Sequence, residues 1–395
     1  MYYITFNIIV KYDIIVLGDN MAVRKKKFKL KPEAIELLKK VGIVFGILLA
    51  IFIFYRHNIN ELKKLGYSEK ASNTILFKFK KSYVMDIGKN KTLNAAFESK
   101  DYDEKNLDHY SKIKYQNHKH LIRNINKLLK KKYDNKGISL ILAHGSDEDV
   151  TEFIKHKKIT YLEEFFTVDY AKIKNYDRYV KYSDESGEDE ETVVLAINLD
   201  MDKENYKEPV KIKKYNKYAL VTKHRQLMKS YKPKLVKIST KYASDNKQQS
   251  TKEAYDAFVK MSKGAEKEGY GIIINSSYRS FEDQQDVCDT YQKLYGTSYV
   301  DKYVAHAGYS EHQTGLAYDI GSKKNKVFST SKEYKWMRNN AYKYGFIQRY
   351  PKGYEDITGF RAEPWHYRYV GKKIAKYIYQ NNMTYEEYYM RFLDK

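Results

Sequence analysis

The chain has one cysteine among its 395 residues, so no intramolecular disulfide can form. A single thiol also cannot build a cysteine-based zinc site, which needs several thiolates. Cys288 falls in a helix predicted over Glu282–Leu294, where it is a passive helix residue. Any metal centre in this protein must therefore be made from histidine and carboxylate ligands.

Acidic residues are fewer than basic ones: the chain has 50 Asp and Glu and 73 Lys and Arg, which gives a net charge of +23. Such a surplus favours nucleic acid, an anionic membrane surface or another polyanion such as a wall polymer. The lysines are spread along the chain, and no RNP motif, zinc finger or recognition helix places basic and aromatic residues to read bases. We expect no nucleic-acid partner. General surface electrostatics is the better interpretation, and anionic wall polymers are a partner suggested by charge alone.

The sequence has an apolar run at residues 41–55 that carries no charge and is long enough to be considered as a membrane-spanning helix. Its helix would be roughly 22 Å long, short of the ~30 Å hydrocarbon core of a membrane. The flanking Lys39, Lys40 and Arg56 can extend it because their heads reach the headgroup region. Residues 1–40 are basic, which keeps them in the cytoplasm by the positive-inside rule. We predict a single-pass transmembrane helix over 41–55, with everything after Arg56 outside the cell membrane.

Two other interpretations of this run stay open, a buried core helix and a cleaved signal peptide. The basic flank disfavours the first, and the lack of a small-x-small cleavage site after Tyr55 disfavours the second. Met21 followed by Ala-Val-Arg-Lys-Lys-Lys resembles a natural start. Residues 1–20 are thus hypothesised to be an over-extended gene start, which peptide mapping of the N-terminus would test.

Residues 56–165 are polar, lysine-rich and mainly helical in pattern, and we interpret them as a helical spacer. A wall-contacting module and a small helical domain without a ligand are the alternatives. Leu65–Ser68 predicts a turn followed by a helix N-cap. Further on, the β-branched content of Thr192–Leu199 predicts a strand, and Tyr218–Thr222 and Leu235–Ile238 predict two shorter ones.

The remaining region, residues 166–395, is predicted to be one α+β domain with its core at 240–380. Thr251–Glu268 repeats apolar residues at helical spacing. Three strands are expected, at Gly271–Asn275, Gly315–Ile320 and Pro364–Val370. We predict a small antiparallel sheet with flanking helices, which carries a zinc site and follows the transmembrane helix and spacer.

The zinc prediction comes from two motifs about fifty residues apart. Ser310–Asp319 (Ser-Glu-His-Gln-Thr-Gly-Leu-Ala-Tyr-Asp) offers His312 and Asp319, and Glu363–His366 (Glu-Pro-Trp-His) offers a second imidazole beside a carboxylate. A catalytic zinc site typically has three protein ligands, a water in the fourth position and a nearby base. The two motifs together predict a mononuclear metallohydrolase.

These motifs resemble the VanY-type D-alanyl-D-alanine carboxypeptidases, a zinc peptidase family of bacterial cell walls. Four blocks match in order, and the likeness is strong over about 240–380 and weaker over 170–240, where Val194–Tyr206 is similar to a lead-in strand. The blocks are Ser277–Gln284, Ser310–Asp319, Tyr344–Pro351 and Thr358–Gly371.

The resemblance implies a role for each matching residue. His312, Asp319 and His366 would bind Zn²⁺, and Glu363 would be the general base that activates water. By the same likeness, Arg279 would stabilise the oxyanion, and Ser310 and Gln284 would bind the substrate.

The activity that the resemblance implies is removal of the terminal D-alanine from peptidoglycan stem peptides. An endopeptidase that cuts within the stem or cross-bridge would use the same zinc chemistry. A non-catalytic wall-binding module that keeps the zinc fold is the alternative from another class.

Overall fold

The computed structural model describes residues 32–156 and 162–394. It divides into two compact units, Met1–Lys112 and Ile113–Lys395. The proposed over-extended start at residues 1–20 and most of the basic N-terminal segment lie outside the described residues.

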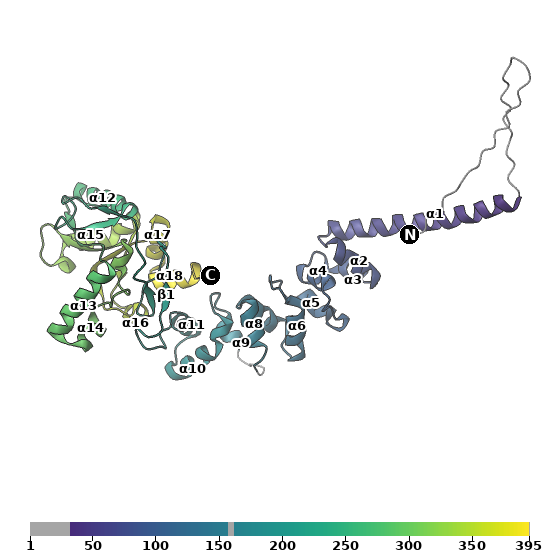
Figure 1. Ribbon diagram of the computed structural model, residues 1–395, viewed down its shortest axis with the longest axis horizontal. Helices are drawn as coiled ribbons and strands as arrows, with labels where there is room; N and C mark the ends of the chain where they lie inside the picture. The colour runs from purple at the N-terminus through teal and green to yellow at the C-terminus, as the bar shows by residue number, and fades with distance from the viewer. Residues whose placement is uncertain (1–31, 157–161, 395) are drawn as a thin grey trace, which may run out of the picture. The chain divides into compact units, whose positions relative to one another are not determined.

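The first unit begins with the long helix α1 (Pro32–Lys64), which contains the predicted apolar run (Figure 1). An 18-residue window of α1 has a mean hydropathy of 2.4, and none of that window is buried. By length and composition, α1 is able to span a membrane. Because residues 41–55 are all exposed, the alternative of a buried core helix is wrong.

From Asn58 onward, α1 contacts α2 and α3, the first two of four short helices, and its buried residues are Asn58, Ile59 and Leu62. Ser68 caps the next helix by accepting a hydrogen bond from the Ala71 N–H, which confirms the predicted turn and N-cap. The four helices are α2 (Glu69–Phe77), α3 (Lys81–Ile87), α4 (Lys91–Glu98) and α5 (Leu107–Lys112).

The second unit begins with five helices, of which α7 and α8 have the same lengths as α2 and α3, 9 and 7 residues. They are α6 (Leu121–Lys130), α7 (Asn135–Ala143), α8 (Asp147–Phe153), α9 (Leu162–Phe166) and α10 (Tyr176–Ser186). The sequence Asn-Ile-Asn occurs at residues 58–60 and again at 124–126, and Leu62 and Tyr67 recur as Leu128 and Tyr133. The α6 helix therefore corresponds to the last part of α1.

The backbone repeats as well as the sequence. The N–H of Tyr67 donates to Leu62 O at 3.0 Å, and the N–H of Tyr133 donates to Leu128 O at 3.2 Å. Both helices end at a residue of positive φ, Gly66 (99°) or Lys132 (63°), as a left-handed helix C-terminus requires.

A buried tyrosine makes the same contact near the end of each copy. Tyr110 accepts a hydrogen bond from the Asp103 N–H at 3.2 Å, and Tyr179 accepts one from the Lys172 N–H at 2.9 Å. Residues 58–112 and 124–186 are thus two copies of one helical module, which we call module 1 and module 2. The region predicted as a plain spacer has this internal repeat.

Removing either hydroxyl should weaken its own module. We expect Tyr110→Phe and Tyr179→Phe each to lower the free energy of unfolding by about 1 kcal/mol, because a backbone N–H loses its acceptor. The Tyr179 change also removes the hydrogen bond that its hydroxyl donates to Asn198 at 2.8 Å. Thermal unfolding measures this, with the exposed Tyr295→Phe as control. Shifts no larger than the control's would contradict the shared role.

Two of the predicted strands are wrong. Thr192–Leu199 lies in helix α11 (Glu190–Asn198) and its C-cap, so Val194–Tyr206 does not begin with a strand. Asp189 caps this helix by accepting from the N–H groups of Glu191 and Thr192, and a cap of this kind overrides a modest β propensity. Tyr218–Thr222 contains only an isolated bridge, at Thr222.

The predicted antiparallel sheet is confirmed. Its strand order is β5-β6-β8-β7, with every neighbouring pair antiparallel. The strands are β5 (Ile272–Ser276), β6 (Ala317–Ser322), β8 (Glu363–Tyr369) and β7 (Phe346–Tyr350). Two small pairs lie outside it: β1 (Val210–Ile212) with β2 (Arg225–Leu227), and β3 (Leu235–Lys237) with β4 (Gln249–Thr251).

Helices pack on this sheet and build the core that holds it (Figure 1). Phe258 and Met261 of α12 and Trp336 of α15 join Ile274 and Tyr318 of the strands in one buried cluster. The apolar spacing that predicted α12 is the face it buries here. The helices of this part are α12 (Lys252–Lys267), α13 (Phe281–Tyr295), α14 (Thr297–Tyr303), α15 (Lys332–Asn340), α16 (Glu355–Thr358), α17 (Lys372–Asn381) and α18 (Tyr385–Phe392).

Candidate metal centre and active site

Strand pairing brings two of the predicted ligands together. Asp319 on β6 lies directly opposite His366 on β8, and side chains of directly opposed residues point to the same face of a sheet. The Nδ1 atom of His366 is 3.2 Å from Oδ1 of Asp319. The register of these two strands therefore places an imidazole and a carboxylate side by side.

The third predicted ligand comes from a turn beside the sheet. His312 lies in the short 3-10 helix η3 (Glu311–Thr314), which Ser310 caps, and its Nε2 atom is 3.3 Å from Oδ2 of Asp319. One donor atom from each of His312, Asp319 and His366 lies within 4.8 Å of the others. Donors bound at about 2.0–2.1 Å in a tetrahedral site lie about 3.3 Å apart. The three side chains fit a single metal ion.

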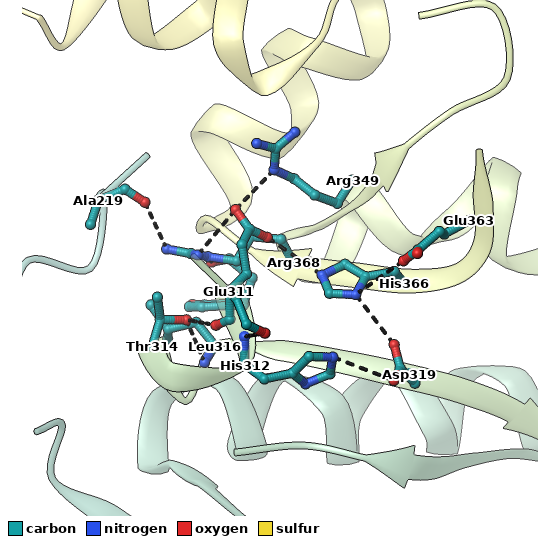
Figure 2. Close-up of polar contacts among 12 residues, drawn as sticks. Ala219, Glu311, His312, Thr314, Leu316, Asp319, Arg349, Glu363, His366 and Arg368 are labelled. Carbon is teal, nitrogen blue, oxygen red and sulfur yellow. Dashed lines mark hydrogen bonds and ion pairs between the residues drawn. The ribbon is translucent and has the colours of Figure 1, made fainter. Parts of the chain in front are cut away.

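The other ring nitrogen of each histidine lies near an oxygen atom, at hydrogen-bond distance for His312 and at ion-pair distance for His366. Nδ1 of His312 is 2.6 Å from the carbonyl oxygen of Ser277. Nε2 of His366 faces Oε2 of Glu311 at 3.5 Å, and Figure 2 shows His366 between Glu311 on one side and Asp319 and Glu363 on the other. Such partners fix the tautomer of a ligand histidine and aim its lone pair at the metal.

Burial and charge move the pKa values of these groups in opposite directions. Burial lowers the pKa of His312. Burial alone would lower the pKa of His366 too, but the carboxylates of Asp319 and Glu311 raise it to about 9. The two imidazoles hold the pKa of Asp319 well below its usual range despite its burial. The aspartate is thus ionised, as a metal ligand must be.

Glu311 belongs to a fully buried ion network behind the metal ligands. Its Oε1 accepts from Nε of Arg349 at 2.9 Å and lies 3.4 Å from Nη1 of Arg368. Arg349 also forms two hydrogen bonds with Glu386 of α18, at 2.9 and 2.5 Å. Although burial would raise the pKa of Glu311, the two guanidinium groups hold it far below the ordinary value. The network balances two arginines against two glutamates.

No role for this network was predicted from the sequence. Glu311 and Arg349 lie inside two of the four blocks that match the VanY family. Their place in these blocks could have indicated that they support the site. Glu386 has no such signal, because only the folded chain brings α18 to Arg349.

A cavity of about 220 Å³ opens at the three donors. Glu363 lines it, with Oε2 3.7 Å from Nδ1 of His366. Burial raises the pKa of Glu363, against the opposing charge of His366. A carboxylate with a raised pKa beside a metal site suits proton transfer near neutral pH.

The other three predicted residues also line this cavity, Arg279, Gln284 and Ser310. Arg279 donates to Oε1 of Gln284 at 2.7 Å, and the amide of Gln284 donates to the Ala305 carbonyl at 2.6 Å. Both ends of the Gln284 amide are therefore engaged, and they hold Arg279 in place. The hydroxyl of Ser310 accepts from the His312 N–H at 3.4 Å.

Comparisons with known proteins identify the family of the region that contains this site. Residues 247–372 match the family described as VanY, D-alanyl-D-alanine carboxypeptidase. The chain is 45% identical to the Bacillus subtilis protein YodJ over 183 residues, which are 44% of this chain and 67% of YodJ. The chain belongs to the VanY family. A D-alanyl-D-alanine carboxypeptidase of Enterococcus faecium is 41% identical over 139 residues, 35% of this chain and 43% of that enzyme.

Solved structures similar to this VanY-family chain include the LD-carboxypeptidase LdcB, at 44% identity with a TM-score of 0.43. That alignment covers 45% of this chain and 87% of LdcB. A second is VanY from the VanB-type resistance cassette in complex with Zn(II), at 33% identity with a TM-score of 0.39. It covers 44% of this chain and 98% of that chain.

The VanY match contains all seven predicted site residues. It ends before Glu386 and begins after both helical modules. The membership supports a peptidase that acts on peptidoglycan.

Proposed function

We propose that this protein is a membrane-anchored, zinc-dependent D,D-carboxypeptidase that removes the terminal D-alanine from peptidoglycan stem peptides. The observation that carries the proposal is the convergence of His312, Asp319 and His366 within 4.8 Å, beside Glu363 and in one cavity with Arg279. Relatives in the VanY family that carry the name D-alanyl-D-alanine carboxypeptidase support the substrate.

In this proposal each side chain has one task. His312, Asp319 and His366 would hold a zinc ion, which would supply a Lewis acid for the scissile carbonyl and make the attacking water more acidic. Glu363 accepts the proton of the attacking water and passes it to the leaving amine of D-alanine. Arg279 stabilises the negative charge that develops on the carbonyl oxygen. Ser310 contacts the terminal carboxylate of the peptide, and Gln284 acts by orienting Arg279.

The proposed topology follows from α1. Its apolar run is exposed, and the basic residues before it place the N-terminus in the cytoplasm. The two helical modules and the catalytic domain that follows module 2 would then lie outside the membrane, where peptidoglycan is found. The surplus of lysine supports an added attraction to anionic wall polymers.

Metal removal and product analysis test this proposal together. The full chain, with and without chelator, is incubated with a pentapeptide stem ending in D-Ala-D-Ala, a tetrapeptide stem and cross-linked muropeptides. We expect mass spectrometry to show loss of one alanine from the pentapeptide, none after chelation, and recovery with added Zn²⁺. Split cross-links would instead support an endopeptidase, and activity that survives complete metal removal would contradict the zinc site.

A further inference from the structure

Two phenylalanines of module 1 are almost fully exposed. Phe77, the last residue of α2, has an exposed fraction of 82%, and Phe79, two residues later, has one of 93%. Neither contributes to the core of module 1. Exposing two large aromatic side chains so close together is unfavourable in water, and such a pair often marks a contact with lipid or protein.

The direction of α2 brings these residues back toward the apolar run of α1. The start of α2 is next to the end of α1, because Lys63 Nζ donates to Glu69 at 3.1 Å. One turn further along α2, Asn73 accepts a hydrogen bond from Tyr55 Oη at 2.7 Å. Tyr55 is the last residue of the apolar run. Phe77 lies one more turn along α2, on the side of Tyr55 where the apolar run begins.

Module 2 is an internal comparison for this feature. At the spacing of 66 residues that relates α2 and α3 to α7 and α8, Phe77 and Phe79 correspond to Ala143 and Gly145. The core residues Ile75 and Val84 on either side recur as Ile141 and Val150. Only the copy that follows the apolar helix has phenylalanines in its α2–α3 connection, so the module fold does not require them.

The backbone conformation of Phe79 also indicates a role outside the fold of module 1. Its φ is +55°, in the left-handed region where glycine or asparagine is the ordinary choice and a bulky residue is strained. A strained and exposed aromatic residue is a reason to look for a function outside the fold.

We propose that Phe77 and Phe79 insert into the membrane interface beside α1. This inference rests on the proposed membrane anchoring of α1. With Tyr55 and Arg56 at the boundary between lipid and water, the α2–α3 connection would reach the acyl-chain boundary, and module 1 would be held against the bilayer. The partner is the lipid of the membrane that α1 crosses.

Tryptophan fluorescence of the full chain in phosphatidylcholine–phosphatidylglycerol vesicles tests the inference. The variants are Phe77→Trp, Phe79→Trp and, as matched control in module 2, Ala143→Trp, which is also exposed. The native Trp336 and Trp365 give a background that the unsubstituted chain measures. We expect the added emission at positions 77 and 79 to be blue-shifted and to be quenched by brominated lipid. The added emission at position 143 should show neither change.

Each other outcome overturns the inference in a distinguishable way. If the chain resists carbonate extraction but position 79 is not quenched, the anchor stands and the inserted loop does not. Emission that is blue-shifted but not quenched would mean that protein, such as a second copy, covers the phenylalanines. Equal quenching at position 143 would mean that the phenylalanines give module 1 no special contact. If carbonate releases the chain from the vesicles, the proposed anchoring fails and the inference falls with it.

Discussion

Replacing Glu363 with glutamine is expected to lower kcat by about 10²–10⁴-fold or more, since a positioned general base contributes that much to proton transfer. Glutamine keeps the size of the side chain and its place on β8 but cannot accept the proton of water. Glu363 is not one of the three convergent donors. Zinc affinity should therefore change little, and it is measured in parallel by competition with a chromogenic chelator.

The matched control for this change is Glu268→Gln, at an exposed position that follows α12. It should leave kcat, KM and zinc binding unchanged. If Glu363→Gln kept a near-normal rate, Glu363 would not be the base. If it lost hydrolysis but kept its function in the cell, the non-catalytic wall-binding alternative would be favoured.

Arg349→Met is expected to be the most destabilising single change in the catalytic domain. It removes the guanidinium that joins Glu311 to Glu386 while all three side chains have an exposed fraction of 0%. Breaking a buried ion pair from one side costs about 3–5 kcal/mol, because a charge is left buried without its partner. For a domain of this size, the melting temperature should fall on the order of 10 °C.

Two further variants separate this effect from ordinary loss of a surface charge. Arg338→Met, at an exposed position of α15, should change stability by less than about 0.5 kcal/mol. The double variant Arg349→Met/Glu386→Leu should recover part of the loss, because one unpaired carboxylate is gone and Glu311 still faces Arg368. A single variant as stable as the Arg338 control would contradict the role assigned to the network.

Much of the catalytic fold could be predicted because its signals are local. The apolar spacing of Thr251–Glu268 and the short β-rich runs at Gly271–Asn275 and Pro364–Val370 depend on residues close in sequence, and the structure has a helix and strands there. The prediction at Thr192–Leu199 was wrong for the same reason. Its β-branched residues predicted a strand. The N-cap at Asp189 and the packing of Leu195 on the catalytic core stabilise a helix instead.

The ligand residues could be named from their types and spacing, but their geometry could not. The distance from His366 to Asp319 depends on the register of β6 against β8, and a slip of one residue would turn one of the two side chains to the other face. The repeat was not predicted, although Leu62, Tyr67, Ile75 and Val84 recur at the same spacing as the Asn-Ile-Asn segment. It becomes evident from the equal lengths of α2 and α7 and of α3 and α8, and from the paired tyrosine contacts.

The sequence by itself determined the chemical inventory of this protein: an uncharged apolar helix near one end, no cysteine-based alternative, and the histidine and carboxylate motifs of the VanY family. Only the tertiary structure decided that His312, Asp319 and His366 converge, that Glu386 of a distant helix pairs with Arg349, and that α2 lies beside Tyr55 at the end of the apolar run. The reason is physical. Residue type and local spacing depend on neighbours along the chain, whereas strand register, buried ion pairing and exposure depend on segments that meet only after folding.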